Sequence, residues 1–336
     1  MPSQVMIQID DRSQVGEARR VAALMAGSLA FEETQAGKVA LAVTEAATNI
    51  VKHAGSGKIL LAPLLRGAGV GMEVLALDRG PGIANLGASL RDGYSTSGSM
   101  GAGLGALSRL SPFFDVYSQP GHGTALRLEI WGTSLTPAPD DALELGAVCL
   151  PKKGEEVAGD GWLLEPSGDY RTLLVVDGLG HGPHAARAAR AATEALAAHP
   201  EATPAALMHI CHGALAATRG AAGAAARVAA AKRQGSFAGI GNIVCRVEGT
   251  DERRQLVSHS GTLGHVMRRV QEFDFSFPAG ALLILHSDGL ATHWASADYP
   301  GLASKHAGLV AGVLYRDHDR GRDDVTVVVL KNMAHA

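Results

Sequence analysis

Aromatic residues are scarce in this chain, at 4% of its 336 residues. Its cores must therefore be built mostly from Ala, Val, Leu and Ile, which a hydrophobic fraction of 46% can supply. Cysteine is scarce as well, and Cys149, Cys211 and Cys245 lie far apart in the sequence. An odd number of cysteines without close spacing predicts neither a disulfide framework nor a zinc site.

Three further absences narrow the class of protein. No run of about 18 apolar residues is present, so we expect no membrane span. The first residues lack the cationic start and apolar stretch of a secretory signal. Lys and Arg are scattered through a chain of net charge −3, without the basic stripe typical of nucleic-acid binding. We therefore expect a cytoplasmic globular protein that binds neither a membrane nor nucleic acid.

A segment rich in proline and small polar residues, GTSLTPAPDD, interrupts the chain at residues 132–141. Such a segment ends any hydrophobic periodicity. It predicts an N-terminal domain over residues 1–132, a linker over residues 133–141 and a C-terminal domain over residues 142–336. Both halves carry helix and strand signals, so the predicted fold class is α+β.

The two halves differ in how these signals are ordered. In the first, helical periods over residues 13–30 and 34–53 are followed by antiparallel strand candidates, which predicts a two-layer α/β sandwich. In the second, strand candidates predominate around two long helices, over residues 184–198 and 204–218. Residues 221–230 are ambiguous, because their alanines favour a helix whereas the helix stop before them allows a strand.

Three polar residues recur at helical spacing in the second predicted helix. Glu45, Asn49 and His53 lie four residues apart and would share one face. A carboxylate and an amide on one face can hold a divalent cation and orient a nucleophile. Taken alone, this signal is weak, because polar residues at such spacing usually form the solvated outer face of a helix.

Glycine-rich motifs follow this helix. Asp78 ends a predicted strand and begins DRGPG, where a carboxylate can accept a hydrogen bond from a base and Gly80 and Gly82 let the backbone approach a ring. The sequence GAGLG, which contains Gly101, Gly103 and Gly105, opens a helix whose backbone N–H groups can face phosphates. Each motif alone also fits a plain turn. Their order, with Gly123 and Thr124 after them, favours a nucleotide site.

On these motifs, residues 4–131 resemble the GHKL ATPase fold, and in particular the small serine/threonine kinases of bacterial sigma-factor switches. The resemblance implies ATP and Mg²⁺ as ligands, a STAS-domain anti-sigma antagonist or stressosome-type scaffold as partner, and a possible homodimer. Residues 92–98 would belong to the lid over ATP. By this resemblance, Glu45 would be the general base, Asn49 the Mg²⁺ ligand and Asp78 the acid that binds adenine. The other nucleotide-binding residues would be Gly80, Gly82, Gly101, Gly103, Gly105 and Thr124.

Four acidic motifs of the second half lie beside predicted strands. They contain Asp160, Asp177, Asp288 and the pair Asp323-Asp324. Carboxylates delivered from several strands to one point form an oxygen-rich site suited to Mg²⁺ or Mn²⁺. Two such ions can activate water and hold a phosphoryl group. A single Asp-Gly is usually a turn, but four in this order favour a metal site.

Residues 145–330 resemble the SpoIIE-like branch of PPM-type serine/threonine phosphatases. The resemblance implies an α-β-β-α sandwich with residues 222–228 in a strand, and two Mn²⁺ or Mg²⁺ ions. It implies Asp160, Asp177, Asp288 and Asp323 as ligands, with the carbonyl of Gly178. No arginine stands just upstream of Asp160 as in eukaryotic relatives. Which residue binds the phosphate therefore stays an open question. The role of His181, in the loop after Asp177, stays open as well.

The two resemblances together predict a bifunctional signalling regulator. Its N-terminal domain would phosphorylate a Ser or Thr of a STAS-type partner, and its C-terminal domain would hydrolyse phosphoserine or phosphothreonine. The alternative is that the phosphatase is the only enzyme and the N-terminal domain is a nucleotide-dependent partner-binding module. An intact Glu45 favours the first hypothesis, because a pure binding module needs no base.

Overall fold

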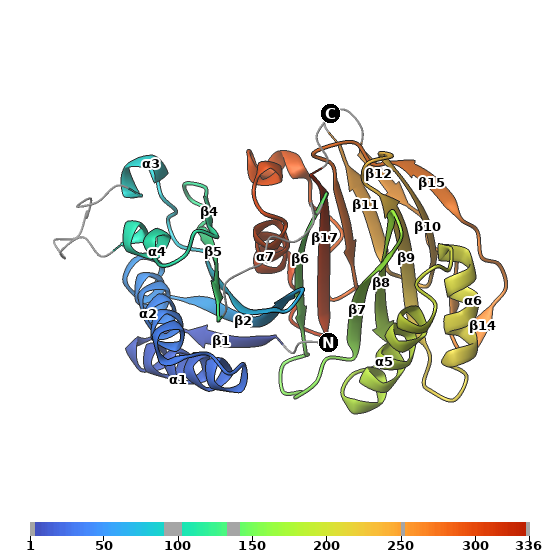
Figure 1. Cartoon of the computed structure of the whole chain (residues 1–336), viewed down its shortest axis with the longest axis horizontal. Helices are drawn as coiled ribbons and strands as arrows, with labels where there is room; N and C mark the ends of the chain where they lie inside the picture. The colour runs from blue at the N-terminus through green and yellow to red at the C-terminus, as the bar shows by residue number, and fades with distance from the viewer. Residues whose placement is uncertain (1–3, 91–102, 133–141, 250–252, 334–336) are drawn as a thin grey trace. The chain divides into compact units, whose positions relative to one another are not determined.

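The computed structural model describes residues 4–90, 103–132, 142–249 and 253–333 (Figure 1). The chain divides into two compact units, Pro2–Asp140 and Asp141–Ala336. Residues 133–141, where we expect the linker, lie outside the described residues. No helix within the described ranges combines the length and apolar composition that crossing a membrane requires.

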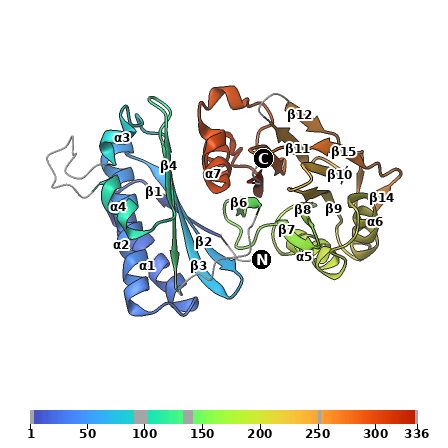
Figure 2. The ribbon, with the colours of Figure 1, turned by 45° about the horizontal axis from the view of Figure 1, so that its top comes forward.

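The N-terminal unit is an antiparallel five-stranded sheet with helices on one face (Figure 2). Helix α1 packs mainly against α2, and its small side chains Ala18, Ala22 and Ala26 are buried in the core. Asp11 begins α1 with a capping box that includes Gln14. The predicted two-layer sandwich is confirmed. The sheet order is β1 (Val5–Ile9), β2 (Gly57–Arg66), β3 (Gly69–Asp78), β5 (Thr124–Trp131) and β4 (Phe114–Ser118), and the helices are α1 (Arg12–Ser28), α2 (Glu33–Asn49), α3 (Leu86–Ser89) and α4 (Leu104–Leu110).

The second helix differs from its prediction at its C-terminal end. Helix α2 ends at Asn49 and continues as a π-helical turn, η1 (Ile50–Ala54). The N–H of Gly55 donates to the carbonyl of Ile50 at 2.9 Å, which is the i→i+5 pattern of a π turn. Glu45 and Asn49 therefore lie in the α-helix and His53 lies in the π turn, and a face shared by all three residues stays a prediction.

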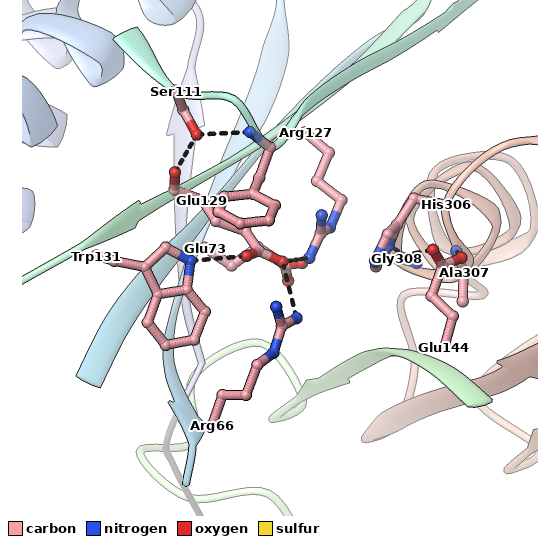
Figure 3. A network of polar contacts seen from close by, with 11 residues as sticks. Arg66, Glu73, Ser111, Arg127, Glu129, Trp131, Glu144, His306, Ala307 and Gly308 are labelled. Carbon is pink, nitrogen blue, oxygen red and sulfur yellow. Dashed lines mark hydrogen bonds and ion pairs between the residues drawn. The ribbon is translucent and has the colours of Figure 1, made fainter. Parts of the chain in front are cut away.

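The sheet face opposite the helices carries a buried ionic network (Figure 3). Arg127 donates to Glu73 and Glu129, and all three side chains are at most 5% exposed. Trp131 donates from Nε1 to Glu129 at 2.8 Å, and Arg66 lies over the Trp131 ring. Burial raises the pKa of Glu73, against the opposing effect of Arg127. Pairing and hydrogen bonding make this buried charge tolerable.

The C-terminal unit has two five-stranded antiparallel sheets packed face to face, with helices on both outer sides. This is the predicted α-β-β-α sandwich, which is confirmed. The first sheet has the order β15 (Phe273–Ser276), β10 (Gln234–Ile240), β9 (Ala221–Ala229), β8 (Tyr170–Gly178) and β7 (Asp160–Ser167). The second has the order β12 (Arg253–Leu256), β11 (Val244–Glu248), β16 (Leu282–His286), β17 (Val325–Asn332) and β6 (Leu143–Leu150).

Strand alternation explains how these layers pack. In β8, Leu173 and Val175 face the second sheet, whereas Leu174 and Val176 face the helices α5 (Pro183–Ala198) and α6 (Pro204–Ala214). A short hairpin, β13 (Gly261–Thr262) with β14 (Val266–Met267), and two 3₁₀ turns, η2 (Ser296–Asp298) and η3 (Leu302–Ser304), complete the unit.

The outer side of the second sheet is covered by α7 (Ala307–His318). His306 accepts the N–H of Gly308 at its start, and Glu144 of β6 accepts the N–H of Ala307 at 2.7 Å (Figure 3). Glu144 also lies 3.4 Å from the other ring nitrogen of His306. A Cβ at Gly146 would lie 2.0 Å from the nitrogen of Gly308, so this glycine is needed for the close approach of β6 and α7.

The alanine-rich segment that was ambiguous in the sequence is the central strand β9. Ala224 and Ala226 face the second sheet, and Ala221 and Ala225 face the helices. Both faces are closely covered, so small side chains fit there and tertiary packing overrides helix propensity. The strand implied by the resemblance is confirmed.

Candidate functional sites

Asp78 of the N-terminal unit is held at the end of β3. Its Oδ1 accepts the backbone N–H of Gly80 at 2.8 Å and of Thr124 at 3.2 Å. Thr124 in turn shares a hydrogen bond with Ser118 through their hydroxyls, at 3.0 Å. Asp78 and Gly80 of the DRGPG motif are therefore brought together with Thr124, which was predicted from a separate part of the sequence.

The glycines of this loop are required by close packing. A Cβ at Gly80 would lie 2.7 Å from the Cβ of Ala54 in the π turn. Gly82 has a φ of +70°, and a Cβ there would lie 2.3 Å from the carbonyl oxygen of Gln119. The loop after Asp78 thus packs between the π turn and the β4–β5 turn. Whether these glycines also line an adenine pocket stays a prediction.

Glu45 and Asn49 lie on the last turns of α2, and both are half-buried. The π turn that follows them contacts the Asp78 loop through Ala54 and Gly80. Burial lowers the pKa of His53 and Lys52 lowers it further, whereas the charge of Asp78 opposes both effects. The helix end and the Asp78 loop therefore adjoin. Carboxylate and amide oxygens fit a hard cation such as Mg²⁺ by their donor chemistry.

The phosphate-binding motif is described only in part. Gly103 is the N-cap residue of α4 and makes no side-chain cap, and Gly105 is buried in its first turn. Uncapped N–H groups at a helix start are available to other acceptors. Gly101 and the predicted lid residues 92–98 lie outside the described residues.

The carboxylates of the C-terminal unit converge from both sheets. Asp160 at the start of β7 pairs directly with Asp177 near the end of β8. By strand alternation, Asp177 lies on the same inner face of β8 as Leu173 and Val175. Asp160 likewise lies on the same inner face of β7 as Trp162. From the second sheet, Asp288 follows β16 and the pair Asp323-Asp324 precedes β17.

Backbone contacts join the segment that contains Asp288 to the segment that contains Asp323 and Asp324. Ser287 donates its N–H to the carbonyl of Thr326, and Thr326 returns a bond to the Ser287 hydroxyl, both at 3.0 Å. A Cβ at Gly289 would lie 2.0 Å from the carbonyl oxygen of Asp324. The side chain of Asp288 accepts a hydrogen bond from Nδ2 of Asn242 at 2.8 Å.

These carboxylates lie close enough to perturb one another. Burial raises the pKa of Asp160 well above its usual range, and Asp177 adds to the effect. Burial also raises the pKa of Asp177 to about 7, with the charges of Asp288 and Asp323 next in importance. The pKa of Asp324 is raised by burial, although backbone N–H groups oppose the shift. Negative charge is thus concentrated at this end of the unit.

The chemistry of these donors fits divalent cations. Within the part of the chain that the structure describes, Oδ2 of Asp160 and Oδ2 of Asp324 are buried without a hydrogen-bond partner. Unpartnered buried carboxylate oxygens are costly unless a cation satisfies them. Across these same described residues, no three acidic, His or Cys side chains form a closed metal-binding group. The acids are therefore gathered at one end of the sandwich without being drawn into a ligand cage.

The structure also distinguishes between residues of the acidic motifs and of the loop after Asp177. Asp324 is 3% exposed and accepts the backbone N–H of Lys152 at 2.8 Å, whereas its neighbour Asp323 is exposed. A period of two counted back from Val328 and Thr326 places Asp324 on the inward face. Gly178 must be glycine, because a Cβ would lie 2.3 Å from the carbonyl oxygen of Ala185. His181 contacts Glu155 through Nδ1 at 2.5 Å.

Comparison with known proteins decides the family. The profile described as "Histidine kinase-like ATPase domain" matches residues 9–130. The serine/threonine-protein kinase RsbT of Bacillus subtilis is 32% identical over 131 residues, which are 39% of this chain and 98% of RsbT. The chain belongs to the histidine kinase-like ATPase family. The match to the family model lies in the N-terminal unit, which contains Glu45, Asn49 and Asp78.

Solved structures extend the similarity beyond the ATPase unit. One described as "The bacterial stressosome: a modular system that has been adapted to control secondary messenger signaling" is 28% identical with a TM-score of 0.53. The match covers 99% of that chain and 56% of this one, which is more than the ATPase unit contains. The PP2C phosphatase domain of SpoIIE from Bacillus subtilis, with part of its regulatory domain, matches at 16% identity and a TM-score of 0.48 over 80% of each chain.

Proposed function

We propose that this chain is a bifunctional signalling regulator that acts in the cytoplasm. Its N-terminal unit transfers phosphate from ATP to a Ser or Thr of a STAS-type partner, and its C-terminal unit hydrolyses phosphoserine or phosphothreonine. The observation that carries the proposal is the inward convergence of Asp160, Asp177 and Asp324, two of which keep an unpartnered buried oxygen. Buried acids with strongly perturbed pKa values gather at functional sites.

For the phosphatase, the chain's own residues have separable roles. Two Mn²⁺ or Mg²⁺ ions, when bound, supply charge neutralisation and an activated water. Asp160, Asp177, Asp288 and Asp323 would hold them, together with the Gly178 carbonyl. Asn242 orients Asp288 through its amide, and the backbone N–H of Lys152 fixes Asp324. Such partners of the ligands commonly change metal affinity about 10–100-fold when removed.

For the kinase, the residues at the end of α2 and in the Asp78 loop support the assignment. Glu45 would accept the proton of the attacking hydroxyl, which is the role of a general base. Asn49 would hold Mg²⁺, which when bound neutralises charge on the ATP phosphates. Asp78 would bind adenine, and the backbone bonds to its Oδ1 hold its carboxylate in place for that purpose. Gly80, Gly82, Gly101, Gly103, Gly105 and Thr124 would surround the nucleotide.

The partner is proposed from the relatives. RsbT is named a serine/threonine-protein kinase, and the description of the 28%-identical structure names the bacterial stressosome. A STAS-domain protein encoded in the same genome is therefore the substrate to test first. Opposing activities in one chain would set the phosphorylation level of that protein.

The deciding experiment compares the wild type with Asp177→Ala and Glu45→Gln variants. Each is incubated with radiolabelled ATP, Mg²⁺ or Mn²⁺, and the purified STAS-domain protein. We expect label to accumulate on the partner with Asp177→Ala, to stay low with the wild type, and to be absent from the Glu45→Gln sample. No label with any variant, while ATP binding is measurable, would contradict the kinase assignment and favour a nucleotide-dependent docking module.

A further inference from the structure

An arginine lies against the loop that follows Asp177. Leu179 donates its N–H to the carbonyl of Gly220 at 3.0 Å, which joins this loop to the connection between α6 and β9. The Nη1 atom of Arg219 lies 3.2 Å from the position that a Cβ would take at Gly180. Gly180 has a φ of +86° and no side chain, so it leaves room for the guanidinium.

The backbone that carries Arg219 is held on both sides. Gly220 donates its N–H to the hydroxyl of Thr218 at 3.0 Å, and this hydroxyl donates to the carbonyl of Leu215 at 2.8 Å. Ala221 exchanges two backbone hydrogen bonds with Leu263, at 3.1 and 2.8 Å. Because this backbone is held by hydrogen bonds, the side chain of Arg219 begins from a fixed position, as a binding residue requires.

Arg219 has no counter-charge among the residues that the structure describes. Its side chain is exposed, and it makes neither an ion pair nor a hydrogen bond with any residue that the structure describes. Unpaired arginines on a surface are ordinary. This one stands beside the loop of Asp177 and Gly178, where Asp160 and Asp324 add further negative charge.

Substrate chemistry favours a side-chain cation at this place. A phosphorylated side chain that approaches a cluster of carboxylates meets repulsion, which a guanidinium at the rim offsets. Arginine presents a planar fork of N–H donors that matches phosphoryl oxygens in bidentate contact. The sequence has no arginine just before Asp160 to fill this role.

We propose that Arg219 binds the phosphoryl oxygens of the phosphoserine or phosphothreonine substrate. It reaches the site from the α6–β9 connection and crosses over Gly180 to do so. The inference rests on the proposed phosphatase function and deepens it, because it names the residue that recognises the group to be hydrolysed.

The test uses the full chain with Mn²⁺ and p-nitrophenyl phosphate as the probe. The variants are Arg219→Met, Arg219→Lys and, as matched control, Arg187→Met, which changes another exposed arginine of the same unit. We expect Arg219→Met to raise KM and the inhibition constant of inorganic phosphate about tenfold or more, as for the loss of a charge-assisted hydrogen bond. The kcat value should change less, Arg219→Lys should be intermediate, and the control should match the wild type.

The outcomes separate the inference from the function on which it rests. Unchanged KM and unchanged phosphate inhibition in Arg219→Met, with wild-type turnover intact, would overturn the role of Arg219 alone. Absence of turnover in the wild type would contradict the phosphatase function instead. Calorimetric titration of inorganic phosphate into Mn²⁺-loaded wild type and Arg219→Met then decides on Arg219, since equal affinities refute it. Equal thermal unfolding temperatures exclude misfolding as the cause of any difference.

Discussion

The acidic residues inside the C-terminal unit are held there against their preference for water. Burial raises the pKa of Asp160, Asp177 and Asp324. The unfolded chain releases these protons near the ordinary carboxyl value of 3.8, whereas the folded chain retains them to higher pH. Between those two values the folded state binds more protons, so its stability falls as pH rises. For Asp177 the window runs from about 4 to about 7.

Replacement of Asp177 by Asn should therefore stabilise the metal-free protein at high pH. The neutral amide has nearly the same shape, cannot ionise and ends the repulsion from Asp288 and Asp323. We expect Tm in the presence of a chelator to rise by several degrees at pH 8 and much less at pH 5, since 1 kcal/mol shifts Tm by roughly 2–4 °C at this domain size. Thermal unfolding followed by circular dichroism measures both values.

The control for this prediction is Asp274→Asn, because Asp274 is an exposed residue of β15 in the same unit. It should change Tm little at either pH. An equal rise at pH 5 and pH 8 for Asp177→Asn would show that ionisation of Asp177 is not the source of the instability.

Individual site residues could be predicted from the sequence where a motif marks them, but their orientation could not. Asp160, Asp177 and Asp288 were found because each precedes a glycine beside a strand. Of the adjacent acids Asp323 and Asp324, the resemblance selected Asp323 as a ligand, yet Asp324 is the buried one. Arg219 carries no motif, and its place beside Gly180 depends on the contact between two connections distant in the sequence.

At the scale of elements, the Asp78 loop is shaped by close contact with its neighbours. Gly82 and Gly121 both have left-handed backbone angles, with φ of +70° and +80°. A Cβ at Gly82 would collide with the carbonyl of Gln119, whereas nothing lies within 4 Å of one at Gly121. The pair therefore separates the effect of backbone strain from that of steric collision.

Replacement of Gly82 by Ala should destabilise the N-terminal unit more than replacement of Gly121. Both variants pay about 1–2 kcal/mol for the left-handed angle, and Gly82→Ala adds roughly 1–3 kcal/mol for overpacking. It should also weaken the binding of a fluorescent ATP analogue, because the loop is displaced from Asp78. Differential scanning calorimetry and a binding titration measure the two effects, and equal losses in both variants would contradict the steric argument.

Elements with clear periodicity were predictable, and those whose form depends on packing were not. Every residue of helix α7 from Ala307 to Arg316 is buried, so the sequence shows no polar face there. For this reason the helix was not predicted. The π turn after Asn49 depends on an i→i+5 bond that no periodicity reveals. Strand β9 contradicts its own helix propensity, and only the resemblance to phosphatases indicated a strand.

At the scale of the whole molecule, each unit has a core of its own. The N-terminal core joins α1, α2 and α4 to their sheet, and the C-terminal unit has one core between its sheets and another under α5 and α6. A unit with its own core can in principle fold alone. The two units also carry different site residues: the nucleotide-binding motifs lie in the N-terminal unit and the acid cluster lies in the C-terminal unit.

Fragments 2–140 and 141–336 should therefore fold when expressed separately. We expect each to give a single cooperative thermal transition, because each unit contains hydrophobic core clusters of its own. Circular dichroism and calorimetry test this, with the full chain as the reference. A fragment that is expressed but lacks a cooperative transition would show that the division at Asp140 does not mark independent folding units.

The position of β6 has a consequence for the synthesis of the protein. Among the described residues, this strand lies at the edge of its sheet and pairs only with β17, the last strand described. On the ribosome, where translation adds roughly 5–20 residues per second, β6 waits about 10–40 s for its partner. The N-terminal unit is by then fully synthesised. Until β17 emerges, the apolar side chains of β6 lack this partner on the nascent chain and need protection, for example by a chaperone.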